Sequence, residues 1–202
     1  DELELLAPAD VIVAVSDHER DIFIQSRNKC TQQVEVMGHV LVPDPTLAAF
    51  EQRAGFLFVG NLDDCKSPNA DSLFWFVDQV WPLIKKNLPE ALLHVVGSAK
   101  SNLVQQLASD SVYILGRVDD VTEYYNRTRV FIAPTRYAAG IPFKIHEACA
   151  KGLPCVASEL VAEQTGWVSH GALVAASIKN PTNYAERCLA LHNDTVLWHS
   201  IR

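Results

Sequence analysis

The stretch that decides the fold covers residues 130–156 and reads VFIAPTRYAAGIPFKIHEACAKGLPCV. It opens on four apolar residues, Val130–Ala133, and closes on a second apolar run that begins at Cys155. A segment of helical length lies between them, starting near Pro142 and stopping at Gly152. The stretch therefore predicts a strand, a loop, a helix and a second strand, which is the repeating unit of a parallel sheet.

Short apolar runs of the same kind recur along the chain. Near-continuous apolarity suits strands that are buried on both faces, and the alternation of these runs with helical segments indicates a mostly parallel sheet. The runs cover residues 11–15, 34–42, 56–59, 92–96, 112–115, 130–133 and 155–157. The predicted fold class is therefore α/β, a Rossmann-like doubly wound parallel sheet.

The clearest helix is predicted over residues 69–87, where apolar side chains repeat at intervals of three and four residues. We expect Ser67 to cap it and Pro68 to take the first helical position, where a missing N–H is harmless. Pro82 lies inside this span and is expected to kink or end the helix. Further helices are predicted after the cap at Ser16, over residues 121–126 behind the turn Asp119-Asp120, and, as one or two helices, over residues 184–201.

The composition of the 202-residue chain is that of an ordinary globular protein, with 49% hydrophobic and 20% charged residues. The net charge of -7 provides no broad basic field, so no nucleic-acid partner is expected and an anionic ligand has to be bound locally. The spacing of the five cysteines and seven histidines favours reduced thiols and no metal site. We see no signal peptide and no run of the about 20 apolar residues that spans a bilayer.

The helix that begins near Pro142 carries the candidate chemistry. Its start is expected at the carboxyl end of a strand, where open α/β sheets bind ligands and where free N–H groups and the helix dipole favour a phosphate. Gly140 lets the backbone approach that phosphate closely. Lys144 and Glu147 share a helix face, so Lys144 can add charge for a diphosphate while Glu147 accepts hydrogen bonds from a ribose. Taken alone, a Lys and a Glu at this spacing are more typical of a solvated helix surface than of a binding site.

The wider pattern identifies a family. The motif Gly-x-x-x-Lys-x-x-Glu-Ala at residues 140–148, followed by Gly-Leu-Pro-x-Val, resembles the donor-binding motif of the GT-B glycosyltransferases of the retaining nucleotide-sugar group, also called group 1 or family 4-like. Segments 56–61, 67–69, 94–98, 114–118 and 130–134 follow the order and spacing of that family. The resemblance implies the C-terminal, donor-binding half of a GT-B fold for residues 34–202. Residues 1–33 are then the tail end of the N-terminal acceptor-side domain, or a linker.

The resemblance also implies a donor site. By position in the family's motifs, Gly60 and Asn61 lie near the donor, Arg117 and Val118 border the base, and Glu147 binds the ribose. The expected donor-binding set is completed by Lys66, Arg136, Tyr137, Gly140, Ile141, Pro142, Phe143 and Lys144. Arg136 and Tyr137 would frame the phosphate or the sugar, although Arg136 is equally well explained as a structural residue. Many relatives carry a second Glu where this chain has Ala139, so the grip on the sugar differs here.

The expected function follows from the resemblance: transfer of a hexose-type sugar from a nucleoside diphosphate donor to a glycan or lipid-linked acceptor, with retention, in polysaccharide biosynthesis. No cofactor and no metal is required by the visible residues. The catalytic residues are unknown, since they are expected in a missing N-terminal domain without which this fragment is inactive. We expect a cytoplasmic protein, peripheral at the inner face of the membrane through the missing half. The alternatives are a sugar-nucleotide epimerase of the same fold and a non-catalytic α/β interaction module.

Overall fold

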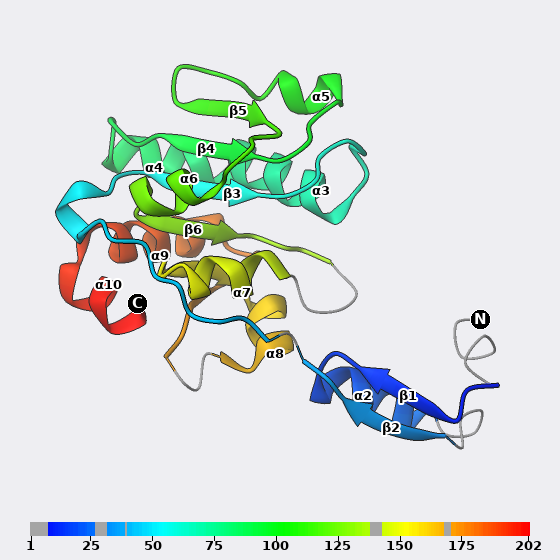
Figure 1. Ribbon diagram of the computed structural model, residues 1–202. Helices are drawn as coiled ribbons and strands as arrows, with labels where there is room; N and C mark the ends of the chain where they lie inside the picture. Colours follow the sequence, from blue (N-terminus) through cyan, green and yellow to red (C-terminus); the bar gives the residue numbers. More distant parts are fainter. Residues whose placement is uncertain (1–7, 27–31, 39, 138–142, 168–170) are drawn as a thin grey trace.

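The computed structural model of the chain describes residues 8–26, 32–38, 40–137, 143–167 and 171–202. A small β–α–β unit at the amino end is followed by a six-stranded sheet with helices on both faces (Figure 1). The strand order of the large sheet is β5-β4-β3-β6-β7-β8, and all its pairings are parallel. This topology confirms the predicted doubly wound α/β fold.

The strands of the large sheet match the apolar runs closely. They are β3 (Phe56–Val59), β4 (Leu93–Val96), β5 (Val112–Gly116), β6 (Val130–Ala133), β7 (Cys155–Ser158) and β8 (Val174–Ala176). Every residue of β6 and β7 is buried, which explains why these segments lack the polar alternation of a half-exposed strand. Edge strand β8 was not predicted, because its apolar run is short and two of its three residues are only partly buried.

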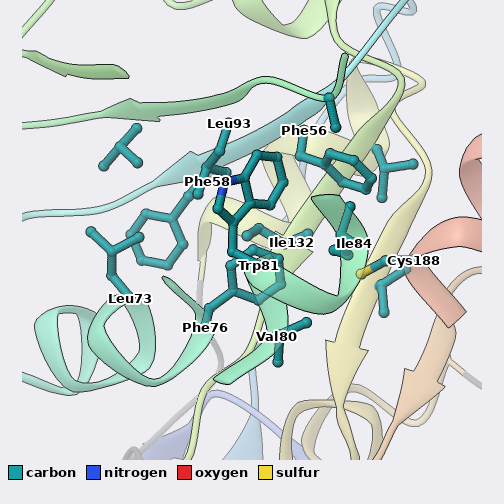
Figure 2. Close-up of a cluster of buried hydrophobic side chains, with 14 of the residues drawn as sticks. Phe56, Phe58, Leu73, Phe76, Val80, Trp81, Ile84, Leu93, Ile132 and Cys188 are labelled. Atoms are coloured by element: carbon teal, nitrogen blue, oxygen red, sulfur yellow. The ribbon is translucent and has the colours of Figure 1, made fainter. Parts of the chain in front are cut away.

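One face of the sheet is covered by α3 (Pro68–Trp75), α4 (Trp81–Asn87), α9 (Pro181–Asn193) and α10 (Thr195–Ile201). Figure 2 shows how Phe56 and Ile132 from the sheet meet Phe76 and Trp81 from the helical layer. The rings of Phe56 and Trp81 pack edge to face with their centroids 5.7 Å apart. Each fully buried side chain of this size stabilises the fold by about 1.5–3 kcal/mol, so this aromatic cluster is a major part of the core.

The helix predicted over residues 69–87 is continuous, but it is not regular. A π-helical turn, η2 (Phe76–Val80), joins α3 to α4, and the N–H of Trp81 bonds the carbonyl of Phe76 five residues back. Pro82 follows at once, in the first turn of α4. Proline lacks an N–H and its ring collides with the carbonyl four residues earlier, so a wider turn at this point accommodates it without ending the helix.

The opposite face is covered by α6 (Thr122–Arg127), α7 (Phe143–Ala150) and α8 (Glu159–Thr165). The short α5 (Asn102–Gln105) contributes Val104 to the core of the first face. Gly152 ends the α7 segment where the sequence predicts, with φ of +67°, a left-handed conformation that suits glycine. The segment predicted over residues 184–201 consists of two helices, because Asp194 ends α9 and caps α10. No helix in the described ranges combines the length and apolarity that a membrane span requires.

The amino-terminal unit consists of β1 (Val11–Ala14), α2 (Asp17–Gln25) and β2 (Gln33–Val36), with the two strands parallel. Ser16 caps α2 as predicted, accepting a hydrogen bond from the N–H of Glu19. The strand predicted over residues 34–42 is wrong beyond Val36: the N–H of Met37 makes the last bond to β1, and Val40 and Val42 are exposed outside any strand. Since β2 pairs with β1, the expected boundary at residue 34 falls inside the small sheet, and the division into 1–33 and 34–202 stays a prediction.

One buried histidine links α9 to the start of β3. The Nε2 atom of His192 accepts a hydrogen bond from the N–H of Gly55, and its Nδ1 lies 2.8 Å from Oδ1 of Asn193. Nε2 therefore carries the lone pair and Nδ1 the proton, which is a single neutral tautomer. The ring also stacks on Phe56 with centroids 5.2 Å apart. Burial lowers the pKa of His192, and Arg129 lowers it further against the opposing effect of Asn193.

This environment predicts an acid-sensitive core. A histidine whose folded pKa is lowered contributes stability that is fully present above its unfolded pKa of about 6.5 and is lost as the pH falls from there toward the folded value. The free energy of unfolding should fall between pH 7.5 and pH 5.5 by up to about 1.4 kcal/mol for each unit that separates the two pKa values. In His192→Gln this part of the fall should vanish, whereas in His199→Gln, at an exposed position, it should persist. Urea unfolding at several pH values measures it, and parallel curves for wild type and His192→Gln would contradict it.

Candidate functional site

The large sheet contains one topological switch point. From β3 the chain proceeds through β4 and β5 to one edge, then returns to β6 beside β3 and proceeds through β7 and β8 to the other edge. The loops that leave β3 and β6 therefore diverge, and in open α/β sheets the crevice between such loops is the usual place for a ligand. The predicted site residues Gly60, Asn61, Lys66, Arg136 and Tyr137 follow β3 and β6, at the edge of the sheet where such a crevice is expected.

The loop after β3 makes a very close backbone contact with β4. The N–H of Gly60 donates to the carbonyl of Val96 at 3.0 Å. Gly97 has φ of +133°, and a Cβ atom there would lie 1.9 Å from the carbonyl oxygen of Gly60. Only glycine fits both this conformation and this contact. Asn61 then turns the loop, since its Oδ1 accepts a hydrogen bond from the N–H of Asp63.

Helix α3 begins at the crevice as predicted. The hydroxyl of Ser67 accepts a hydrogen bond from the N–H of Ala70, and Pro68 is the first helical residue. The side chain of Asn69 follows: its Nδ2 donates to the carbonyl of Asn61 at 3.2 Å, and its Oδ1 accepts from Nζ of Lys144 on α7. One amide thus connects the loop after β3 to the helix after β6.

A second contact spans the crevice next to the first. The hydroxyl of Tyr137, in the loop after β6, donates to the carbonyl of Lys66 at 2.8 Å. The Tyr137 side chain is about half exposed and Lys66 is exposed, so the ammonium group of Lys66 remains available to an anionic ligand. The two predicted residues are thereby brought together although 71 positions separate them.

Lys144 combines a buried stem with a positive charge. Its Nζ lies 5.0 Å from the centroid of the Phe58 ring, a cation–π distance. Burial lowers the pKa of Lys144 to about 8, against the opposing effect of the neighbouring Cys155 thiol. At pH 7 the amine is therefore mostly protonated, and its charge is poorly solvated and strongly available to a bound anion.

Glu147 lies one turn further along α7, on the side that faces α6. The Tyr125 side chain there is completely buried, and its hydroxyl makes no hydrogen bond of ordinary geometry within the described ranges. Burial raises the pKa of this phenol, and the nearby Glu147 carboxylate raises it further. Lys144 and Glu147 thus present opposite charges about one helical turn apart, as their spacing predicts.

The other predicted residues are more dispersed. Arg117 is exposed just after β5, and Val118 packs against the core formed with α6 and α7. The guanidinium of Arg136 lies 3.5 Å from the carboxylate of Asp71 on α3, so it has a structural partner in addition to its place near the crevice. Phe143, at the start of α7, is 48% exposed. Gly140, Ile141 and Pro142, together with Ala139, lie outside the described residues.

Two functional candidates escaped the sequence analysis. Asn69 was noted only as part of the resemblance around Ser67, and nothing local distinguishes it from any polar residue in a first helical turn. Asp71, the partner of Arg136, was not singled out either. Both matter through contacts with residues more than 60 positions away, which a local pattern does not reveal.

Metal-binding and thiol chemistry find little support within the described ranges. There, no group of three His, Cys, Asp or Glu side chains is placed to hold a metal ion. The carboxylate of Asp120 accepts a hydrogen bond from the N–H of Thr122, which lowers its pKa and confirms the turn before α6. His146 packs edge to face against Trp167, away from Lys144. Four cysteines are free thiols, and Cys30 lies outside the described residues.

The geometry suits one kind of ligand. The crevice offers an ammonium group on Lys144, a second on Lys66 and a helix amino terminus, all of which attract an anion. Glu147 adds a hydrogen-bond acceptor about one turn away. A molecule with a phosphate group at one end and neighbouring hydroxyl groups further along would satisfy both parts.

Comparison with known proteins gives this site a context. The sequence profile described as "Glycosyl transferases group 1" matches residues 53–194. An uncharacterized glycosyltransferase of Haemophilus influenzae is 30% identical over 155 residues, 73% of this chain and 41% of that protein. An uncharacterized 44.6 kDa protein in the cps region of Klebsiella pneumoniae is 25% identical over 197 residues, 91% of this chain and 46% of that protein.

The fold has many counterparts among solved structures. HepE of Anabaena in complex with UDP-glucose superposes with a TM-score of 0.78 at 16% identity, over 98% of this chain and 58% of that one. At this identity the likeness concerns the fold alone. The chain spans less than half the length of the two curated relatives it matches.

The contact between Gly60 and Gly97 makes a prediction about the first loop. Gly97→Ala should destabilise the protein by several kcal/mol, because the new methyl group collides with the Gly60 carbonyl. Gly116→Ala is the matched control: its φ is +68° but nothing lies within 4 Å of the added Cβ, so only the left-handed penalty of about 1–2 kcal/mol is expected. Urea unfolding compares the two, and equal losses would show that the close contact is unimportant.

Proposed function

The chain belongs to the glycosyl transferases group 1 family, and from this we propose that it binds the nucleoside diphosphate sugar in an enzyme that transfers the sugar to a glycan or lipid-linked acceptor. One observation carries the proposal. The ammonium of Lys144 lies at the switch-point crevice beside the start of α3, with the carboxylate of Glu147 one turn further along the same helix. An ammonium group can pair with the diphosphate of a nucleotide, and a carboxylate one turn away can accept hydrogen bonds from the hydroxyls of its ribose.

The diphosphate is proposed to lie against the loop after β3 and the start of α7. The backbone N–H groups of Asn61, Gly140 and Ile141 would bind its oxygens, and Lys144 and Lys66 would offset its charge. When the sugar leaves, negative charge grows on the bridging oxygen of the departing diphosphate. Donors that are held in place before the reaction stabilise that charge more than mobile water does, so the same groups would promote the reaction.

The nucleoside is proposed to lie along α7 and the end of β5. Glu147 would accept hydrogen bonds from the two ribose hydroxyls, and Arg117 and Val118 would border the base. The buried Tyr125 hydroxyl beside Glu147 supports a fixed orientation for that carboxylate. Arg136, Tyr137 and Phe143 would frame the transferred sugar, for which the position of Ala139 supplies no acid.

The relatives support the choice of donor and pathway. The Anabaena structure contains UDP-glucose, which favours a nucleoside diphosphate hexose as donor here too. The cps-region relative favours a role in polysaccharide biosynthesis. We further propose that the reaction retains the anomeric configuration, as the family does, and that it proceeds without a metal ion or other cofactor.

The rest of the enzyme is proposed to be an N-terminal domain that binds the acceptor and supplies catalytic residues. The length of the relatives supports this, as does the small β–α–β unit, whose outward Val11 and Val13 side chains are about half exposed. A cavity of about 360 Å³ separates that unit from α7 and α8. The chain alone would then be inactive, and the whole enzyme would be cytoplasmic and peripheral at the inner face of the membrane.

Nucleotide titration tests the proposal directly. In calorimetric titrations with UDP, GDP and ADP, we expect one of the three to bind at millimolar concentration or below. Glu147→Ala should weaken that nucleotide about tenfold to a hundredfold, because a hydrogen bond to a charged group contributes about 1.5–3 kcal/mol. Its melting temperature should stay nearly unchanged, as should both properties of Glu186→Ala, an exposed site on α9.

The same titrations separate the alternatives. Absence of binding by all three nucleotides would contradict the donor site and favour a non-catalytic interaction module. Binding followed by release of an altered sugar nucleotide from the full-length protein, without any acceptor, would indicate an epimerase.

Lys144 predicts how the affinity depends on pH. The amine is charged below its pKa of about 8 and neutral above it, so affinity for the nucleotide should fall as the pH rises from 7 to 9.5. In Lys144→Gln the affinity should be lower at pH 7 and nearly flat over this range. Lys144→Arg keeps a charge at every pH and serves as the control for the titration. A wild-type affinity that does not change with pH would show that this ammonium does not contact the ligand.

A further inference from the structure

The side-chain amide of Asn69 on α3 contacts both the loop after β3 and helix α7. We propose that Asn69 is a positioning residue of the donor site, whose side chain aims the Lys144 ammonium and holds the loop after β3 in register with it. The inference rests on the proposed function, because it concerns how the same site is kept in shape. Asn69 itself is not required to touch the donor.

The geometry of the amide supports two simultaneous tasks. Its nitrogen donates to the carbonyl of Asn61 at 3.2 Å, and its oxygen accepts from Nζ of Lys144, 75 residues further along the chain. Asn69 is the second residue of α3, directly behind the cap at Ser67, so its backbone is held by the first helical turn. Since the donor and acceptor of one planar amide cannot move independently, the loop and the ammonium are held relative to each other.

Asn69 can orient the Lys144 ammonium without neutralising it because its side chain is uncharged. An ammonium group with a buried stem needs a hydrogen-bond acceptor, or it loses its proton or swings toward water. An amide oxygen meets that need and leaves the full positive charge for a diphosphate, whereas a carboxylate would neutralise it. Among the described residues, the Phe58 ring on β3 and the Cys155 thiol on β7 also face Lys144.

Gly60 makes room for this amide. A Cβ atom at position 60 would lie 3.0 Å from Cγ of Asn69 and 3.2 Å from its Nδ2, tighter than ordinary side-chain contacts. A larger residue would push the Asn69 amide away from Asn61, Lys144 or both. The glycine after β3 and the asparagine in α3 therefore act as one unit, in addition to the contact between Gly60 and Gly97.

Two variants with opposite electrostatic effects test the proposal. In the free chain, the titration of the Lys144 amine is followed by pH-dependent labelling with acetic anhydride and mass spectrometry. Asn69→Asp should raise the midpoint above the wild-type value of about 8, because the new carboxylate stabilises the ammonium. Asn69→Ala should lower it, because the acceptor is gone. Asn87→Ala, an exposed asparagine at the end of α4 that bonds only within its own helix, should leave it unchanged.

The second measurement is the affinity for UDP at pH 7 by calorimetry. Both Asn69 variants should bind at least about tenfold more weakly, as expected for the loss of one hydrogen bond to a charged group or the neutralisation of its charge. Melting temperatures are recorded alongside, and the near-isosteric Asn69→Asp variant covers the case in which Asn69→Ala fails to fold.

The two measurements separate the possible outcomes. Midpoints that move in opposite directions, together with weaker UDP binding, support the proposal. Unchanged midpoints in both folded variants overturn it, even if UDP binds the wild-type chain. If the midpoints move but the wild-type chain binds no nucleotide, Asn69 still positions Lys144, and it is the donor site of the proposed function that fails.

Discussion

The rest of the structure depends on the burial of β3 and β6 on both of their faces. The side chains of Phe56, Leu57 and Phe58, and all four of Val130–Ala133, are fully buried. Buried strands need neighbours on both sides for their N–H and carbonyl groups and helices above and below for their side chains. The chain therefore extends the sheet outward in both directions from this pair. The switch point at the carboxyl ends of β3 and β6, and hence the crevice, follows from that arrangement.

A few specific contacts connect the polar residues of the candidate site to the buried strands. The stem of Lys144 is buried over Phe58, so the core that stabilises the sheet also lowers the pKa of the amine and strengthens its attraction for an anion. The close contact of Gly60 with Gly97 sets the path of the first loop, and Asn69 joins that loop to α7. Stability and the proposed ligand binding thus draw on the same residues at this edge of the sheet.

Fold and function rest on different observations in this protein. Structures at 16% identity establish the architecture, which unrelated activities share, whereas the family match over residues 53–194 and the charges at the crevice support donor binding. The amino-terminal β–α–β unit has an incompletely covered sheet. Its two-stranded sheet is covered by α2 on one side and carries the half-exposed Val11 and Val13 on the other, and a sheet of two strands is only marginally stable alone.

The sequence by itself determined the order of the elements, the caps at Ser16 and Ser67, the end of the α7 segment at Gly152 and the family, because apolar period, capping and left-handed glycines are local properties. It also located Lys144 and Glu147 on one helix. Only the tertiary structure decided that β2 ends at Val36, that Pro82 is accommodated by a π-helical turn, and that β8 extends the sheet. It alone brought Asn69 to Lys144 and Tyr137 to Lys66. The physical reason is that these last two contacts join residues more than 70 positions apart, so they form only when the layers of the fold pack together.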